Sequence, residues 1–242
     1  MHPHWVEHSI AALVARMESD LERLTDARRH FHGTYLRTTI AVGEEITRGG
    51  FADNAWLERW DLVFADLYLD ALDADLNGQE VPKPWRVAFD APAELPPLRH
   101  VLLGMNAHIN YDLPQALIAV ITPEEFADEA LLQRREADHR HVDEVLVARV
   151  GEEDRGAKKK LVDRLLGPAN RAATRRFLVE SRRKVWHNTA MLDRARRDGT
   201  YQIALKRLEE LCAARVAELT APGQVLLRLA RRGFGVTLDR WA

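Results

Sequence analysis

The sequence predicts an all-α fold, a single-domain multi-helix bundle packed around one buried helix. Between clusters of glycine and proline, apolar residues recur every three or four positions, and no stretch alternates as a strand does. The segment Leu98–Ile121, LRHVLLGMNAHINYDLPQALIAVI, is of helical length and apolar nearly all round, as a buried helix is. We therefore expect residues 1–242 to form one helical domain with this segment at its centre.

Start and stop signals set the order of the helices. Thr122-Pro123-Glu124-Glu125 has the cap, proline and acids of a helix start, whereas Gly167-Pro168 and Pro222-Gly223 are breaks. The proline-rich connection from Val81 to Pro97 is expected to shape the rim of a cavity. The predicted helices span about 5–24, 27–48, 53–75, 82–91, 97–121, 124–149, 153–166, 169–198, 200–219 and 222–234.

Composition narrows the possible classes of protein. A hydrophobic content of 46% with 30% charged residues is typical of a globular protein, and the net charge of −2 selects neither nucleic acid nor membrane as a partner. The single cysteine, Cys212, excludes an internal disulfide and is expected in the core. No signal peptide is visible and no apolar run reaches the roughly 20 residues of a membrane span. We expect a cytoplasmic protein.

The central segment carries polar side chains that need partners if they are buried. His108 and Asp112, four residues apart, share one helix face, and Asn106 and Asn110 lie on the other side. Pro114 cannot donate a hydrogen bond to the carbonyl of Asn110, so we expect a kink or break there. A free carbonyl beside an imidazole and a carboxylate is a plausible seat for a cation or a water.

Two further helices place an acid on an apolar face. Asp61 falls on the stripe of the 53–75 helix, and Asp138 falls on that of the 124–149 helix. A carboxylate on a buried side is costly unless it is paired or binds a cation. His139 and Asp143 repeat the His-x-x-x-Asp spacing, but the charged run around them favours a surface position for His139 and His141.

Charge is segregated along the chain, with acids prevailing in residues 51–80 and Lys/Arg in residues 155–197. Only Phe177 and Trp186 are interleaved with the basic residues, so we favour a solvated face with internal pairing over nucleic-acid binding. Arg182 and Trp186 are four residues apart, which brings a guanidinium beside an indole. This pair is expected either to close the cavity or to cover the core.

With these residues in view, the chain resembles a family of uncharacterised, mostly actinobacterial proteins known as a domain of unknown function. The matching pieces are WDLVFADLYLDAL around Asp61, PKPWRVAF around Trp85, GMNAHINYDLPQAL around His108 and SRRKVWHNTAML around Trp186. They span most of the chain, and the Asn-Ala-His-Ile-Asn-x-Asp-Leu-Pro string is the most specific. The resemblance implies a helical domain with a shared polar centre and no established activity.

The chain is also similar, more weakly, to the zinc-dependent phospholipase C and single-strand nuclease group. These all-helical enzymes carry a His-x-x-x-Asp pair followed by proline, as in His108/Asp112 with Pro114, and a later His-x-x-x-acid pair, as in His139/Asp143. Asp61 would match an earlier aspartate ligand. Ile118 stands where a further histidine ligand would be expected, so this similarity implies at most one metal ion.

Four hypotheses remain open. In the first, a metal-dependent hydrolase holds one zinc, iron or manganese ion that activates a water. In the second, His108 and Asp112 are a metal-free acid–base pair acting on a small apolar substrate. The third is a ligand-binding bundle, and the fourth is a buried hydrogen-bond network that only fixes the packing. A small-molecule ligand is expected in the first three, and the oligomeric state is left open. The candidate residues are His108, Asp112 and Asp138 for catalysis, Asn106, Asn110, Arg182 and Trp186 for ligand binding, and Asp61, His108 and Asp112 for the metal.

Overall fold

A computed structural model of the chain describes residues 9–153, 168–223, 229 and 233–239, including side chains except at 147–179. Within these residues every regular element is helical and none is a strand, which confirms the predicted all-α fold. The elements are α1 (Ile10–Arg23), α2 (Arg28–Thr47), α3 (Asn54–Leu76), α4 (Lys83–Phe89), α5 (Pro97–Ala107), the π-helical turn η1 (His108–Asp112), α6 (Leu113–Val120), α7 (Pro123–Ala127), α8 (Glu129–Glu153), α10 (Pro168–Arg197) and α11 (Tyr201–Thr220).

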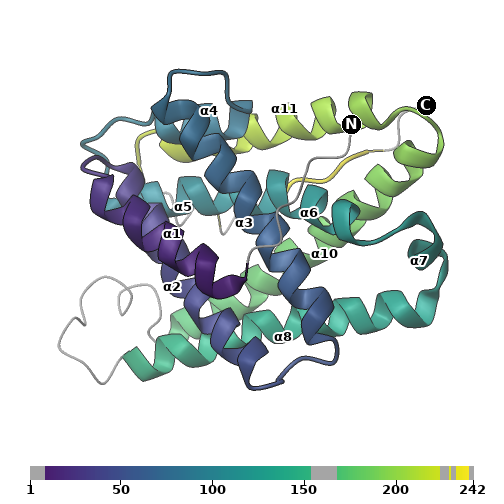
Figure 1. Cartoon of the computed structure of the whole chain (residues 1–242). Helices are drawn as coiled ribbons and strands as arrows, with labels where there is room; N and C mark the ends of the chain where they lie inside the picture. The colour runs from purple at the N-terminus through teal and green to yellow at the C-terminus, as the bar shows by residue number, and fades with distance from the viewer. Residues whose placement is uncertain (1–8, 154–167, 224–228, 230–232, 240–242) are drawn as a thin grey trace.

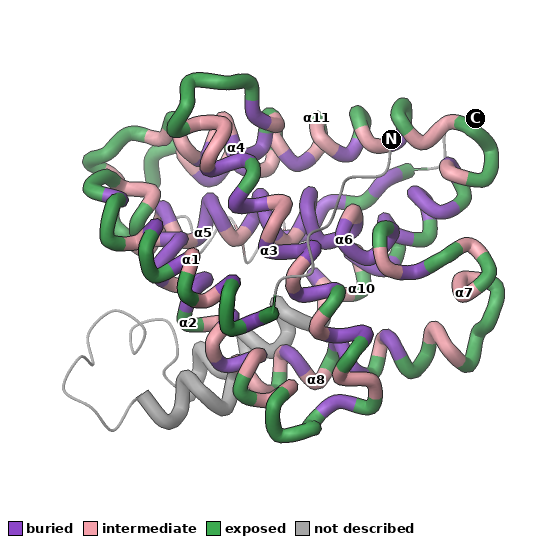
Figure 2. The backbone as a smooth tube through the Cα atoms, in the orientation of Figure 1, coloured by how far each residue is buried: buried purple, intermediate pink, exposed green. Residues whose placement is uncertain are grey.

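The continuous rod α5–η1–α6 is the predicted central helix. Its first half packs against α2 and α11, and its second half packs against α3 and α10. Figure 1 shows this rod in the middle of the bundle, with α11 on one side and α8 on the opposite side. Buried residues are concentrated along the rod and α3 (Figure 2). The prediction of a buried central helix is therefore confirmed.

Three apolar clusters fill the spaces around the rod. The first includes Met17, Phe31 and Trp85, and the second is built on Trp56 and Trp60. The third joins α10 and α11 and contains Cys212, which is fully buried as predicted. Burying one large apolar side chain contributes about 1.5–3 kcal/mol, so these clusters are the main force that holds the helices together.

The rod continues past Pro114, so the predicted break does not occur there. The N–H of Leu113 bonds to the carbonyl of His108, one residue further back than in an α-helix, so residues 108–112 form a single π-turn. α6 then begins at Leu113 with Pro114 in its first turn, where a missing N–H leaves no intrahelical bond unmade. The wide turn thus absorbs the proline, and the helix is neither broken nor ended.

Several predicted boundaries need correction. The start signal at Thr122 is confirmed as a capping box, but its helix ends at Ala127, and Asp128 separates α7 from α8. The helix predicted at 153–166 falls on residues 154–167, outside the described part of the chain. The helix predicted at 222–234 is wrong at its end, because residues 233–239 are not helical.

Residues 233–239, hereafter the C-terminal segment, are extended (yellow in Figure 1). Residues 234–236 and Leu238 are buried, whereas Thr237 and Asp239 are exposed. Burial thus alternates with a period of two from Val236 on, as it does in strand-like backbone. Here the partners are helix side chains, as described below.

Among the described helices, none is both long and apolar enough to cross a membrane.

Candidate functional site

The site begins with a close approach of α2 to α5. A Cβ atom at Gly104 would lie 2.3 Å from a ring carbon of Phe31, so only glycine admits that ring. Gly104 stands one turn before His108, and Phe31 also contacts the His108 imidazole edge-on, with ring centroids 5.9 Å apart. The glycine therefore allows α2 to deliver aromatic side chains to the π-turn.

The imidazole of His108 lies in an aromatic cage. It stacks on Phe64 of α3, with centroids 3.6 Å apart and the planes within 4°. Tyr35 meets it edge-on at 4.5 Å, and Tyr68 and Trp85 complete the cage at 6.0 Å each. With 3% of its surface exposed, His108 is held in an apolar environment that disfavours a charged ring.

Asp112 fixes the orientation of this ring. Its Oδ2 lies 2.9 Å from His108 Nδ1, and it accepts a hydrogen bond from Trp85 Nε1 at the same distance. Burial raises the pKa of Asp112 well above its usual range, against the smaller opposing effect of the Trp85 hydrogen bond. Burial also lowers the pKa of His108 well below its usual range. Both directions favour an uncharged pair.

An uncharged pair has a consequence for the second ring nitrogen. When the Asp112 hydroxyl donates to Nδ1, the ring proton lies on Nε2. His108 Nε2 has no hydrogen-bond partner within the described part of the chain. A buried donor without an acceptor is costly, typically about 1–3 kcal/mol. The cage is therefore incomplete at this atom.

Asp61 is a second incomplete group near the cage. It lies three residues before Phe64 on α3, is 4% exposed, and its Oδ2 has no hydrogen-bond partner among the described residues. Burial, with a further contribution from the charge of Glu58, raises the pKa of Asp61 to about 7. Burial, followed by the charges of Asp61 and Asp112, raises the pKa of Tyr35, so Tyr35 lies within electrostatic reach of both acids.

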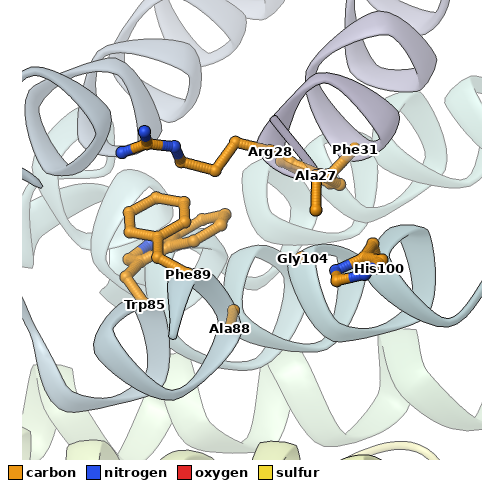
Figure 3. A pocket seen from close by; sticks show the side chains of 8 residues that line it. All are labelled: Ala27, Arg28, Phe31, Trp85, Ala88, Phe89, His100 and Gly104. Carbon is orange, nitrogen blue, oxygen red and sulfur yellow. The ribbon is translucent and has the colours of Figure 1, made fainter. Parts of the chain in front are cut away.

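A small cavity lies beside the cage (Figure 3). Its volume is about 20 Å³, enough for a water molecule. Phe31 and Trp85 form part of its wall and also contact His108, so they separate the cavity from the imidazole. As predicted for the rim, α4 from the proline-rich connection contributes to the lining. The full lining is Ala27, Arg28, Phe31, Trp85, Ala88, Phe89, His100 and Gly104.

The structure does not bring Asp138 to this cage. Its two oxygens accept hydrogen bonds from the backbone N–H groups of Ala52 and Asp53, at 2.8 and 3.0 Å. Asp53 caps α3, and Phe64 lies eleven residues further along that helix. At 1.5 Å per residue, Asp53 and Phe64 are roughly 16 Å apart along α3. Asp138 thus anchors the loop before α3, which accounts for its burial.

Arg182 and Trp186 contact α8 and not His108. Arg182 forms an ion pair with Asp143, and Trp186 Nε1 donates to His139 Nδ1 at 3.0 Å. The two contacts join antiparallel helices. His139 and Asp143 are four residues apart on α8, and Arg182 and Trp186 are four residues apart on α10. The prediction of a surface position is wrong for His139, which is 5% exposed, and burial lowers its pKa to about 3. His141 is partly exposed and lies 3.1 Å from Glu45.

Asn106 and Asn110 lie on the side of the rod away from the cage and bind the C-terminal segment. The amide nitrogens of both donate to the carbonyl of Phe234, at 3.0 and 3.2 Å. These amide nitrogens are therefore paired with backbone that is distant in sequence, whereas Asn106 Oδ1 has no hydrogen-bond partner among the described residues.

Of the three proposed metal ligands, the structure brings His108 and Asp112 into contact, and Asp61 lies nearby on α3. Asp112 bonds the Nδ1 side of the ring, which leaves Nε2 as the nitrogen available to a ligand. Within the described residues no three His, Cys, Asp or Glu side chains are grouped as a metal centre requires.

The sequence pattern did not predict the cage. Phe64 and Trp85 lie in two of the pieces that carry the family resemblance, whereas Tyr35 lies outside all of them. The available signal was Gly104, because a glycine one turn before a buried histidine indicates a close approach by another element.

A model of a family described as a family of unknown function (DUF5995) matches residues 9–222. No curated protein and no solved structure matches the chain.

Proposed function

Because the chain belongs to DUF5995, a family of unknown function that supplies no activity to carry over, we propose a function from the geometry alone. We propose that the protein is a small-molecule enzyme that uses His108, Asp112 and Asp61 for metal-free acid–base chemistry. The observation that carries this proposal is the buried His108 Nε2 without a partner, on a ring oriented through Nδ1 by Asp112.

The chemistry of the cage defines the ligand. Aromatic walls favour an apolar body, and a donor at Nε2 favours an acceptor oxygen on it, such as a carbonyl. In the proposed reaction the Asp61 carboxylate takes a proton from the carbon next to the carbonyl, Nε2–H passes its proton to the carbonyl oxygen, and Asp112 passes its proton to Nδ1. The reverse transfers return the protons to Nε2 and Asp112 when the carbonyl forms again. Asp61, with a pKa of about 7, exchanges a proton with the substrate near neutral pH. The cavity beside Phe31 and Trp85 is the proposed entrance, and these two rings move when a ligand enters.

Two compounds of similar shape test ligand binding. Acetophenone has a carbonyl acceptor, and ethylbenzene lacks it. We expect acetophenone to bind more tightly and to shift the NMR signals of His108 Nε2. His108→Phe retains a ring to stack on Phe64 but removes the donor, so the preference for the ketone should disappear. Asp198→Asn, on the exposed surface, is the control.

Proton transfer is tested by exchange of the acetophenone methyl hydrogens with deuterium from the solvent. We expect the wild type to accelerate this exchange and Asp61→Asn to abolish the acceleration. If neither compound perturbs His108, and the folded His108→Phe variant matches the wild type in every assay, the polar cluster serves packing alone and the proposal fails.

The second candidate is a site for one divalent metal ion. One observation favours it: a carboxyl group bonded to Nδ1 with Nε2 left open is the arrangement that orients a metal-bound histidine. His108 Nε2 and Asp61 Oδ2 would be the ligands, with Asp112 behind the ring. Metal analysis of the purified protein, with thermal unfolding in added zinc or manganese, tests it. Absence of both bound metal and stabilisation would end this candidate.

A further inference from the structure

The C-terminal segment is held by a set of side-chain amides. Asn110 donates to the carbonyl of Phe234 and accepts from the N–H of Val236 at 3.3 Å. Asn188 on α10 repeats this pattern two residues later, donating to the Val236 carbonyl at 3.1 Å and accepting from the Leu238 N–H at 2.8 Å. We call Asn106, Asn110 and Asn188 the asparagine clamp.

The clamp binds the segment as the edge strand of a β-sheet binds an added strand. Asn110 and Asn188 each use one N–H donor and the oxygen acceptor of the carboxamide on the segment, as a backbone peptide group would. Lys184 and His187, also on α10, add hydrogen bonds to the carbonyls of Gly235 and Leu238, at 3.1 and 3.0 Å. All of these bonds end on backbone atoms of the segment. Since every peptide has these atoms, the hydrogen bonds select for an extended backbone conformation and do not distinguish one sequence from another.

Selectivity therefore depends on side-chain packing. Phe234, Val236 and Leu238 are buried at alternate positions, and Val236 and Leu238 join the cluster between α10 and α11. At Gly235 a Cβ atom would lie 2.6 Å from the Lys184 side chain and 3.5 Å from Asn110 Oδ1. The recognised pattern is thus apolar, glycine, apolar, any residue, apolar.

We propose that the asparagine clamp and its neighbours on α10 and α11 form a binding site for an extended peptide, and that the occupant is exchangeable. The occupant in the structure is the chain's own C-terminal segment. The partner that fits the same site is the C-terminal segment of a second copy, because that copy presents the same backbone, the same glycine and the same three apolar side chains. Two copies can thereby join by exchange of their C-terminal segments.

Two complementary variants test the exchange. The first, Phe234→Ala/Gly235→Val, keeps the clamp and impairs the segment. The second, Asn110→Leu/Asn188→Leu, keeps the segment and impairs the clamp. Mixed together, they should form a one-to-one heterodimer in analytical ultracentrifugation, whereas each variant alone should remain without this species. If the mixture forms no heterodimer although both proteins are folded, the proposal is overturned.

A peptide with the sequence of residues 232–241 provides the second measurement, which also stands if the clamp variant does not fold. It should bind to Phe234→Ala/Gly235→Val with an affinity at least about tenfold higher than the same peptide with valine in place of the glycine at position 235. The intact chain is the control, because its attached segment competes at high effective concentration and should prevent binding. Equal affinities for the two peptides, or no binding to the folded variant, would also overturn the proposal.

Discussion

At the scale of single residues, the molecule keeps several ionisable groups in an uncharged interior. His108 and Asp112 share a hydrogen bond and favour neutral forms, whereas Asp61 Oδ2 has no partner among the residues that the structure describes, and the pKa of Asp61 is about 7. A group whose pKa is raised in the folded state ties stability to pH, because the folded protein retains a proton that the unfolded chain has released.

We predict that Asp61 makes the protein less stable as the pH rises from about 4 to about 7. Its pKa rises from 3.8 to about 7 on folding. Below the lower value the group is protonated in both states and contributes nothing. Above the higher value it is ionised in both states, and its burial costs up to about 4 kcal/mol.

Asp61→Asn should remove the share of the decline that comes from Asp61 and leave the share that comes from Asp112, which urea unfolding at a series of pH values measures. Asp198→Asn, at an exposed position, should retain both shares. A wild-type stability that declines no more than that of Asp61→Asn would show that the raised pKa is absent.

At the scale of elements, the approach of α2 to α5 is the contact on which the cage depends. We predict that Gly104→Ala costs about 1–3 kcal/mol, because its methyl group would overlap the Phe31 ring. Gly33→Ala on α2 is the matched control. A Cβ there meets Leu21 at 3.4 Å, and alanine stabilises a helix interior by up to about 1 kcal/mol relative to glycine. Thermal unfolding of both variants measures the difference, and equal effects would contradict the prediction.

Elements also show what the sequence could and could not predict. Helix type and burial of the rod followed from apolar spacing and length, because both depend on local pattern. The effect of Pro114 could not be predicted in this way. A proline breaks the interior of an α-helix, but it is tolerated here because it directly follows a π-turn. The last predicted helix was extended to residue 234, into the C-terminal segment, because the partners of that segment, Asn110 and Asn188, are far away in sequence.

The candidate site was predictable to a similar degree. His108 and Asp112 could be paired from their spacing, since four residues make one helical turn. Burial of Asp61 and Asp138 could also be expected from the apolar stripes around them. The hydrogen-bond partners of these two acids could not be predicted, because an apolar stripe indicates which side of a helix faces inward and not which groups lie opposite. Asp138 thus binds backbone N–H groups at the start of α3.

At the scale of the whole molecule, the family match ends at residue 222, whereas the C-terminal segment that fills the core lies beyond it. The acids at the end of α3 pair with arginines of α1, α2 and α4, which fastens the first half of the chain to itself. These pairs are Asp73 with Arg16, and Asp75 with Arg28 and Arg86. The second half relies on the C-terminal segment for part of its apolar packing.

We predict that a chain ending at residue 222 is less stable than the full chain by roughly 5 kcal/mol. The loss comes from three buried apolar side chains, with a further cost from the clamp amides left without partners. Urea unfolding measures it. A chain ending at residue 239 keeps the segment and should resemble the full chain. Equal stability of the two truncated chains would contradict the prediction.

The π-turn at His108–Asp112 also sets the angular phase of the rod. One additional residue in the turn rotates everything after it by about 100° relative to a continuous α-helix. The two halves of one helix can therefore address different neighbours, α2 and α11 before the turn and α3 and α10 after it. Deleting a single residue here would turn Leu117 and the other buried side chains of α6 away from their present neighbours while leaving the helix itself intact.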